Sequence, residues 1–258
     1  MAKAKKPKSP DQNRTPPFET DDLRKNLTTF LDTPFGIGKI GDHRWGVYAF
    51  FDYDGEPIYV GQTNERVRVR IRRHLTNQRT DAVAMSVLDP FEVFKIVVWP
   101  LPGFQDITKS GEHKDKFKDA KAHLNALERL MYDQSVAASK FGAILNEKDA
   151  PVTSLAITEP PKCEGQLVSD AVYAIRSHVD FRISRRALII SRLAQVISER
   201  ELKTGGLRRV MLVQSQRLES LARRRFEALG GKYSVPVKKE DEEETDGEDD
   251  GEEIGDSE

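Results

Sequence analysis

Alternating apolar residues over 45–61 predict a β-hairpin. Two runs rich in aromatic and β-branched residues flank an Asp-Gly dipeptide (residues 54–55), which tolerates the positive φ angles of a two-residue turn. Counting outward from this turn pairs Tyr48 with Gly61 and puts Tyr59 on the same face as Tyr48. The two hydroxyls become diagonal neighbours, and the glycine leaves room for a ligand. The alternative is an ordinary hairpin whose tyrosines serve packing.

Helical spacing of apolar residues predicts helices over about 20–31, 64–77 and 115–139. Residues 64–77 also alternate as a strand would, and we favour a helix because a side chain able to cap it precedes the segment. The run 91–99 is almost continuously apolar, which is typical of a strand buried on both faces. The front of the chain is therefore predicted to be an α/β domain with a three-stranded antiparallel sheet flanked by helices.

Charged residues lie at informative positions on two of these helices. Arg66, Arg70 and His74 recur every four residues and line up on one face, although most charge runs are simply solvated faces. In the later helix, Glu128 falls in the buried half. Burying a carboxylate is costly unless a cation meets it, so we expect either an arginine or a metal ion beside Glu128.

The order of these features resembles that of the GIY-YIG nuclease superfamily, over about residues 40–150. The segments 46–48 (Gly-Val-Tyr) and 59–61 (Tyr-Val-Gly) are similar to its paired signature, and 141–146 is similar to its closing motif. The resemblance implies a small nuclease domain of the GIY-YIG type. It also implies a set of catalytic residues: Tyr48, Tyr59, Arg70, His74, Glu128 and Asn146.

The resemblance further implies a cofactor and a mechanism. Glu128 would be the metal ligand and hold one Mg²⁺ (or Mn²⁺) against the scissile phosphate. Tyr48, helped by Tyr59 or His74, would deprotonate or orient the attacking water. Either Arg70 or the metal would lower the pKa of that tyrosine, and Arg70 would neutralise charge on the phosphate.

The arginine assignment has an alternative. Arg70 and His74 lie one residue further from the second motif than is common in the family, so Arg66 or Arg68 is the other candidate for the functional arginine. Arg66 and Arg73 are also expected to contact DNA.

The C-terminal third is strongly basic. Residues 163–239 hold 16 basic and 7 acidic residues, and apolar spacing predicts helix over about 166–202 and 207–229. The arrangement is either two short segments plus a connection or a long helical hairpin. One interpretation is a DNA-binding arm; the other is a helical appendage packed on the nuclease domain or a homodimer interface. The predicted DNA contacts of this region are Arg182, Arg185, Arg186, Arg208, Arg209, Arg223, Arg224 and Arg225.

Composition predicts disorder at both ends, since residues 1–19 are basic and proline-rich and residues 240–258 hold 13 acidic and no basic residues. The expected organisation is a disordered basic tail (1–19), a nuclease domain (20–150), a linker (151–165), a basic all-helical domain (166–232) and a disordered acidic tail (233–258).

The remaining composition narrows the class of protein. The single cysteine, Cys163, excludes internal disulfides and multi-cysteine zinc sites. No apolar run reaches the length of a membrane span and the basic start lacks the core of a signal peptide, so we expect a cytoplasmic protein without a membrane partner.

The predicted function is Mg²⁺-dependent hydrolysis of DNA phosphodiester bonds by an endonuclease, in restriction, homing or another DNA-processing role. One alternative is a structure-selective repair or recombination nuclease. Another is a catalytically inactive DNA-binding or assembly protein with a nuclease fold. The polar positions expected of the family are all filled, which favours the enzyme.

Overall fold

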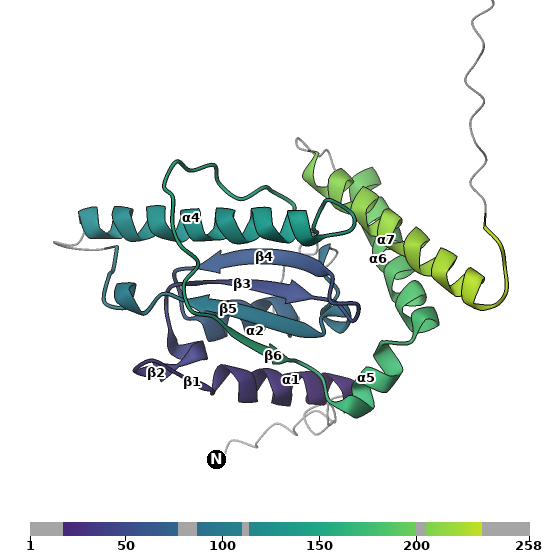
Figure 1. Cartoon of the computed structure of the whole chain (residues 1–258), viewed down its shortest axis with the longest axis horizontal. Helices are drawn as coiled ribbons and strands as arrows, with labels where there is room; N and C mark the ends of the chain where they lie inside the picture. Colours follow the sequence, from purple (N-terminus) through teal and green to yellow (C-terminus); the bar gives the residue numbers. More distant parts are fainter. Residues whose placement is uncertain (1–17, 77–86, 110–113, 200–204, 234–258) are drawn as a thin grey trace, which may run out of the picture.

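Four antiparallel strands form the centre of the computed structural model, which describes residues 18–76, 87–109, 114–199 and 205–233. The strand order is β4-β3-β5-β6, so β4 and β6 are the edges of the sheet (Figure 1). The strands are β3 (Gly46–Phe51), β4 (Pro57–Thr63), β5 (Lys95–Pro100) and β6 (Cys163–Gln166). Residues 1–17 and 234–258, which the sequence assigns to tails, lie outside the described residues.

The hairpin register predicted from the sequence is confirmed, because Tyr48 pairs with Gly61. The connection is wider than the two-residue turn expected. The backbone amide of Asp52 donates to the carbonyl of Glu56 at 3.0 Å, which encloses three residues. Gly55 adopts a φ of +73°, a conformation that favours glycine and explains the dipeptide.

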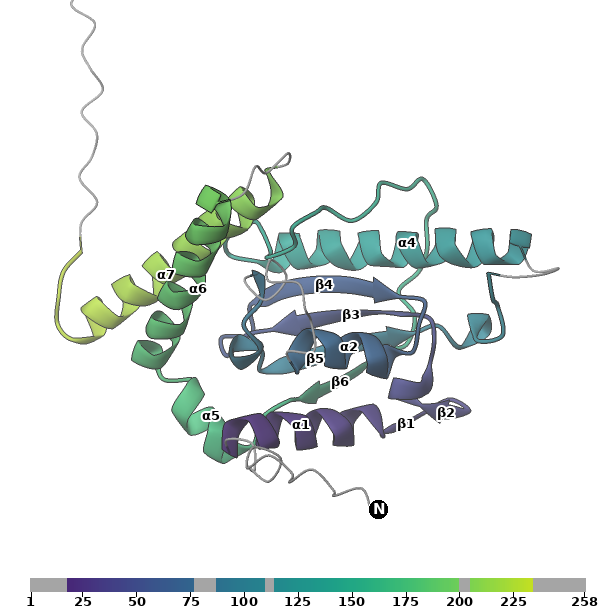
Figure 2. The ribbon, with the colours of Figure 1, turned by 180° about the vertical axis from the view of Figure 1, so that it is seen from behind.

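Helices cover both faces of the sheet. Helix α4 (Lys114–Ala138) lies along one face, and α1 (Phe18–Leu31) and α2 (Val67–Leu75) lie on the other (Figures 1 and 2). Because side chains alternate along β3, Val47 packs in the cluster under α4, whereas Tyr48 packs in the cluster under α1 and α2. Among the described residues, no helix combines the length and apolar character needed to cross a membrane.

Short elements connect these layers. Strands β1 (Pro34–Phe35) and β2 (Gly38–Lys39) pair as a small hairpin before β3. The 3₁₀ turns within the described residues are η2 (Ile40–Asp42), η3 (Pro90–Glu92) and η4 (Pro102–Phe104).

Strand β6 corrects the expected three-stranded sheet. Residues 163–166 pair with 95–98 of β5, although the sequence had assigned 151–165 to a linker. The tetrapeptide Cys-Glu-Gly-Gln lacks the alternating apolar residues that mark a strand, so backbone pairing places it. A Cβ at Gly165 would lie 2.5 Å from the ring of Phe30, so this glycine lets α1 approach the edge of the sheet.

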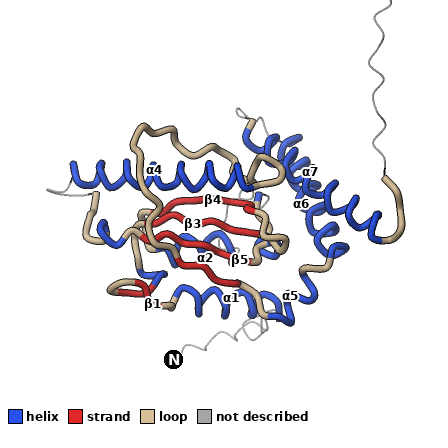
Figure 3. Tube along the Cα trace, in the orientation of Figure 1, coloured by secondary structure: helices blue, strands red, loops and turns tan. Residues whose placement is uncertain are grey.

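The C-terminal helices pack against one end of the sheet (Figures 1 and 3). The helix expected over 166–202 is instead β6 followed by α5 (Asp170–Arg176) and α6 (Val179–Glu199), and α7 (Gly206–Ala228) pairs with α6. Buried apolar residues of α6 and α7 belong to the same cluster as those of β3 and β5. The helical region therefore shares a core with the sheet.

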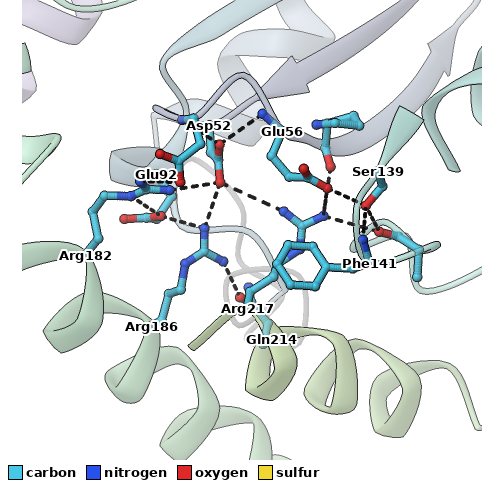
Figure 4. A network of polar contacts seen from close by, with 12 residues as sticks. Asp52, Glu56, Glu92, Ser139, Phe141, Arg182, Arg186, Gln214 and Arg217 are labelled. Carbon is cyan, nitrogen blue, oxygen red and sulfur yellow. Dashed lines mark hydrogen bonds and ion pairs between the residues drawn. The ribbon is translucent and has the colours of Figure 1, made fainter. Parts of the chain in front are cut away.

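Three buried arginines join α6 and α7 to the hairpin (Figure 4). Arg182 and Arg186 are 1% and 2% exposed, and both donate to Oδ2 of Asp52, at 2.9 and 3.1 Å. Arg186 also pairs with Glu92 at 2.8 Å. Arg217 lies beside them, 3.9 Å from Asp52. We call these five residues the arginine cluster.

The arginine cluster overturns part of the predicted DNA interface. Removing a charged side chain from water costs several kcal/mol. In the arginine cluster, Arg182 and Arg186 each lie beside both Asp52 and Glu92, and these opposite charges offset the cost. Burial nevertheless raises the pKa of the Glu92 carboxyl, against the pull of Arg186 and Arg182. The prediction that Arg182 and Arg186 contact DNA is wrong, because their guanidinium groups lie inside the protein.

Candidate active site

A cleft of about 400 Å³ opens at the free edge of β4, where side chains from both faces of the sheet converge. Tyr59, Arg70 and His74 reach it from the side of α2, and Glu128 reaches it from α4 on the other side. The segment 146–150 forms a further wall. Five of the six predicted catalytic residues thus line one cavity, and Tyr48 is the exception, although α2 and α4 cover opposite faces of the sheet.

Tyr48 lies behind this cleft instead of in its wall. Its side chain is fully buried, its ring stacks on that of Tyr59 at 6.3 Å between centroids, and its hydroxyl oxygen accepts a hydrogen bond from Nε of Arg70 at 3.2 Å. Burial raises the pKa of Tyr48, and the charge of Arg70 opposes this only in part. Arg70 lowers the pKa of Tyr48 as expected, but burial raises it by more, so the pKa of this tyrosine lies above its ordinary value.

Gly61 makes room for Tyr48 itself. A Cβ at this position would lie 2.6 Å from the hydroxyl oxygen of Tyr48 and 3.0 Å from the ring of Tyr59. The space opposite Tyr48, which the sequence suggested was left for a ligand, is filled by the tyrosine.

We expect Gly61→Ala to destabilise the protein by about 1–3 kcal/mol, because the buried ring of Tyr48 has to move to accept the methyl group. The free energy of unfolding in urea measures this. Gly38→Ala is the matched control, since a Cβ there meets nothing within 4 Å. Equal unfolding midpoints for the two variants would contradict this account of Gly61.

Glu128 is held on the cleft wall by a glutamine that the sequence analysis did not single out. Nε2 of Gln62 donates to Oε2 of Glu128 at 2.5 Å, and Oε1 of Gln62 accepts from the ammonium of Lys121 at 2.7 Å. Burial raises the pKa of the Glu128 carboxyl, while the hydrogen bond from Gln62 and the charges of Lys121 and Arg70 act in the opposite direction.

A signal for these two residues is present in the sequence. Gln62 is a polar side chain that alternates onto the face of β4 under α4, and Lys121 precedes Glu128 by seven residues, or two helical turns. A polar strand residue facing a Lys and a Glu on one side of a helix indicates a polar contact between the two elements.

Asn146 lines the cleft and supports the edge strand β4. Its side-chain oxygen accepts from the amide of Val60 at 3.0 Å, and its side-chain nitrogen donates to the carbonyl of the same residue at 2.7 Å. The asparagine thereby pairs with the exposed edge of β4 as a neighbouring strand would.

Four arginines at the start of α2 and along it have different surroundings. Arg68 extends toward α1 and pairs with Asp32 at 2.7 Å, while Arg66 is exposed. Arg73 pairs with Glu65 at 2.8 Å. Arg70 is the member of this group that lines the cleft, so geometry favours it over Arg66 and Arg68 as the functional arginine.

Comparison with known families agrees with this geometry. Residues 44–102 match the model of the GIY-YIG catalytic domain. This part of the chain carries a domain of the GIY-YIG nuclease superfamily. No curated protein and no solved structure gives a significant match. The matched segment contains Tyr48, Tyr59, Arg70 and His74. Glu128 and Asn146 lie outside it, so their assignments are based on their position in the cleft.

GIY-YIG domains are nuclease domains that generally require a divalent metal ion, and DNA is the substrate that this family implies. The donor set of the cleft fits such an ion. Among the described residues there is no group of three or more His, Cys, Asp or Glu able to hold a metal ion. Glu128 would therefore be a single protein ligand, and no described residue donates a hydrogen bond to its Oε1. Mg²⁺ is commonly bound by one or two carboxylates, with water and substrate phosphate as its other ligands.

Most predicted DNA contacts of the C-terminal helices pair with other side chains of the protein. Arg208 is exposed, and within the described part of the chain it is the member of this set that forms no ion pair. The others pair within the protein: Arg185 with Asp89, Arg209 with Asp149, Arg223 with Glu219, Arg224 with Asp54 and Arg225 with Asp180.

Arg209 also contributes to the cleft indirectly. It donates to the carbonyl of Asn146 at 2.9 Å as well as to Asp149, and both acceptors belong to the cleft wall. The start of α7 packs closely on the same wall, since a Cβ at Gly206 would lie 2.3 Å from the carbonyl oxygen of Glu147. Helix α7 therefore holds a wall of the GIY-YIG cleft.

Proposed function

We propose that the chain is a DNA endonuclease that hydrolyses phosphodiester bonds with one Mg²⁺ (or Mn²⁺) held by Glu128. The observation that carries this proposal is the convergence of Tyr59, Arg70, His74 and Glu128 on one cleft at the edge of β4. A nuclease needs a cation over the phosphate, a group that positions water and a ligand for the metal, and this cleft supplies one candidate for each.

Arg70 is the residue that neutralises the phosphate. Its Nε is committed to Tyr48, which fixes the guanidinium plane, and no described residue bonds its two terminal nitrogens. These nitrogens are available for two phosphate oxygens, an arrangement in which guanidinium groups bind strongly. Charge growing on those oxygens in the transition state strengthens this contact and lowers the barrier.

Tyr59 is the tyrosine that positions the attacking water, because it lines the cleft whereas Tyr48 does not. His74 lies beside it, with ring centroids 5.2 Å apart, and is our candidate for receiving the proton from the water. When bound at Glu128, the metal ion supplies Lewis-acid stabilisation of the phosphate and leaving oxygen. Tyr48 is a positioning residue that holds Arg70.

Cleavage assays of the full-length protein test the proposal. Supercoiled plasmid and branched DNA duplexes are incubated with Mg²⁺, Mn²⁺ or EDTA, and the ends of the products are sequenced. We expect metal-dependent cleavage that EDTA abolishes, and the mapped ends distinguish sequence-specific cutting from recognition of DNA structure. DNA binding without cleavage of any substrate in either metal would overturn the proposal in favour of an inactive nuclease fold.

DNA affinity should come from exposed basic residues near the cleft. Arg66 immediately precedes α2, one turn before Arg70, and is exposed, and Lys148 is exposed on the cleft wall. We expect Arg66→Ala and Lys148→Ala each to reduce the salt dependence of DNA binding by about one unit of slope. Lys25→Ala on α1 is the control and should leave the slope unchanged.

A further inference from the structure

Gln62 links the edge strand β4 to three side chains of α4. Its Nε2 donates to Oε2 of Glu128 at 2.5 Å and to Oδ1 of Asn125 at 3.0 Å, and its Oε1 accepts from Nζ of Lys121 at 2.7 Å. All hydrogen-bonding atoms of the amide are therefore used. These contacts are partly buried, so they carry more weight than a surface contact would.

The chemistry of the neighbours fixes which way the amide points. An ammonium group only donates and a carboxylate only accepts, so the amide oxygen must face Lys121 and the amide nitrogen must face Glu128. The reverse orientation would put two acceptors against each other at Glu128 and two donors against each other at Lys121. Lys121 thus determines the direction of the hydrogen bond that reaches Glu128.

The position of the lysine is also informative. Lys121 bonds to the amide and is not in ion-pair contact with Glu128. A direct ion pair would place a cation against the carboxylate and compete with a metal ion for its oxygens. The intervening amide keeps the carboxylate oriented and holds one oxygen, Oε2, while no described residue donates to Oε1.

We propose that Gln62, oriented by Lys121, is a positioning residue of the metal site that aims Oε1 of Glu128 at the ion. This inference rests on the proposed function, because it requires Glu128 to be the metal ligand. Residues that orient a metal ligand by a hydrogen bond to its side chain typically contribute 10–100-fold to metal affinity. Neither residue touches the substrate or the ion in this proposal, so each acts through the carboxylate alone.

Binding of Mn²⁺ to the full-length protein, measured by isothermal titration calorimetry without DNA, tests the inference. Gln62→Leu should weaken binding about 10–100-fold, because the carboxylate is no longer held. Lys121→Met should weaken it in the same direction, and Lys121→Arg, which keeps a donor, should restore most of the affinity. Thermal unfolding of each variant provides the control for folding.

Three outcomes decide the matter. If Gln62→Leu and Lys121→Met both bind Mn²⁺ as the parent does while Glu128→Ala does not, the positioning role is overturned and the metal site stands. If Glu128→Ala binds as the parent does, the proposed metal site itself fails, and the inference fails with it. If Gln62→Leu binds weakly but cleaves DNA normally at high Mn²⁺, the positioning role is supported, since a purely structural defect would not respond to the metal concentration.

Discussion

Glu128→Ala should lower the rate of DNA cleavage about a thousandfold, because a metal ion contributes several kcal/mol of transition-state stabilisation and each 1.4 kcal/mol is tenfold in rate. DNA binding and folding should change little, since Glu128 makes no phosphate contact in the proposed mechanism and meets the rest of the protein mainly through Gln62. Single-turnover cleavage measured with saturating enzyme separates the rate from the affinity.

The chain offers a matched control in Glu147, which lines the same cleft from the wall on the other side. We expect Glu147→Ala to cleave within about threefold of the parent, which is less than 1 kcal/mol in the barrier. A Glu128→Ala protein that cleaves as fast as the Glu147→Ala protein would show that the metal ligand lies elsewhere.

Arg182→Met should destabilise the protein by about 3–5 kcal/mol, the usual cost of removing one partner from a buried ion pair. The methionine side chain is unbranched like the arginine stem but carries no charge, so Asp52 and Glu92 remain buried with one fewer cation beside them. Asp54, which is partly exposed, loses a contact at 2.8 Å as well. The free energy of unfolding in urea is the measurement.

The control for this variant is Arg223→Met on α7. Arg223 pairs with Glu219 one turn away on the solvated side of the helix, where the loss of an ion pair has little effect on folding. Its unfolding midpoint should match that of the parent. If Arg182→Met also matches the parent, the arginine cluster does not hold the helices on the sheet.

The sequence predicted the parts of the site that depend on local spacing. The alternation of side chains in the hairpin correctly paired Tyr48 with Gly61, and the four-residue spacing on α2 correctly put Arg70 and His74 on one face. Both inferences use the geometry of a single element. Glu128 was found in the same way, from its place in the buried half of one helix.

Long-range charge pairing could not be predicted from the same patterns. Arg186 and Asp52 are 134 positions apart, and nothing in the helix containing Arg186 distinguishes an arginine that pairs inside the protein from one that meets solvent or DNA. Strand β6 was missed for a related reason, because its partner strand supplies the hydrogen bonds and its own side chains carry no apolar alternation.

The arginines of the arginine cluster lie far later in the sequence than the carboxylates they pair with, so they are synthesised later. During synthesis the hairpin with Asp52 is made first, and its partners Arg182 and Arg186 follow 130 and 134 residues later. Before these arginines are synthesised, Asp52 and Glu92 have no arginine partners from α6, and the cleft wall lacks the hydrogen bond from Arg209 to the carbonyl of Asn146. A nascent or prematurely terminated chain that ends before α6 therefore carries the GIY-YIG signature without the cleft wall that α7 holds, and the proposed endonuclease activity would require α7 to have been made.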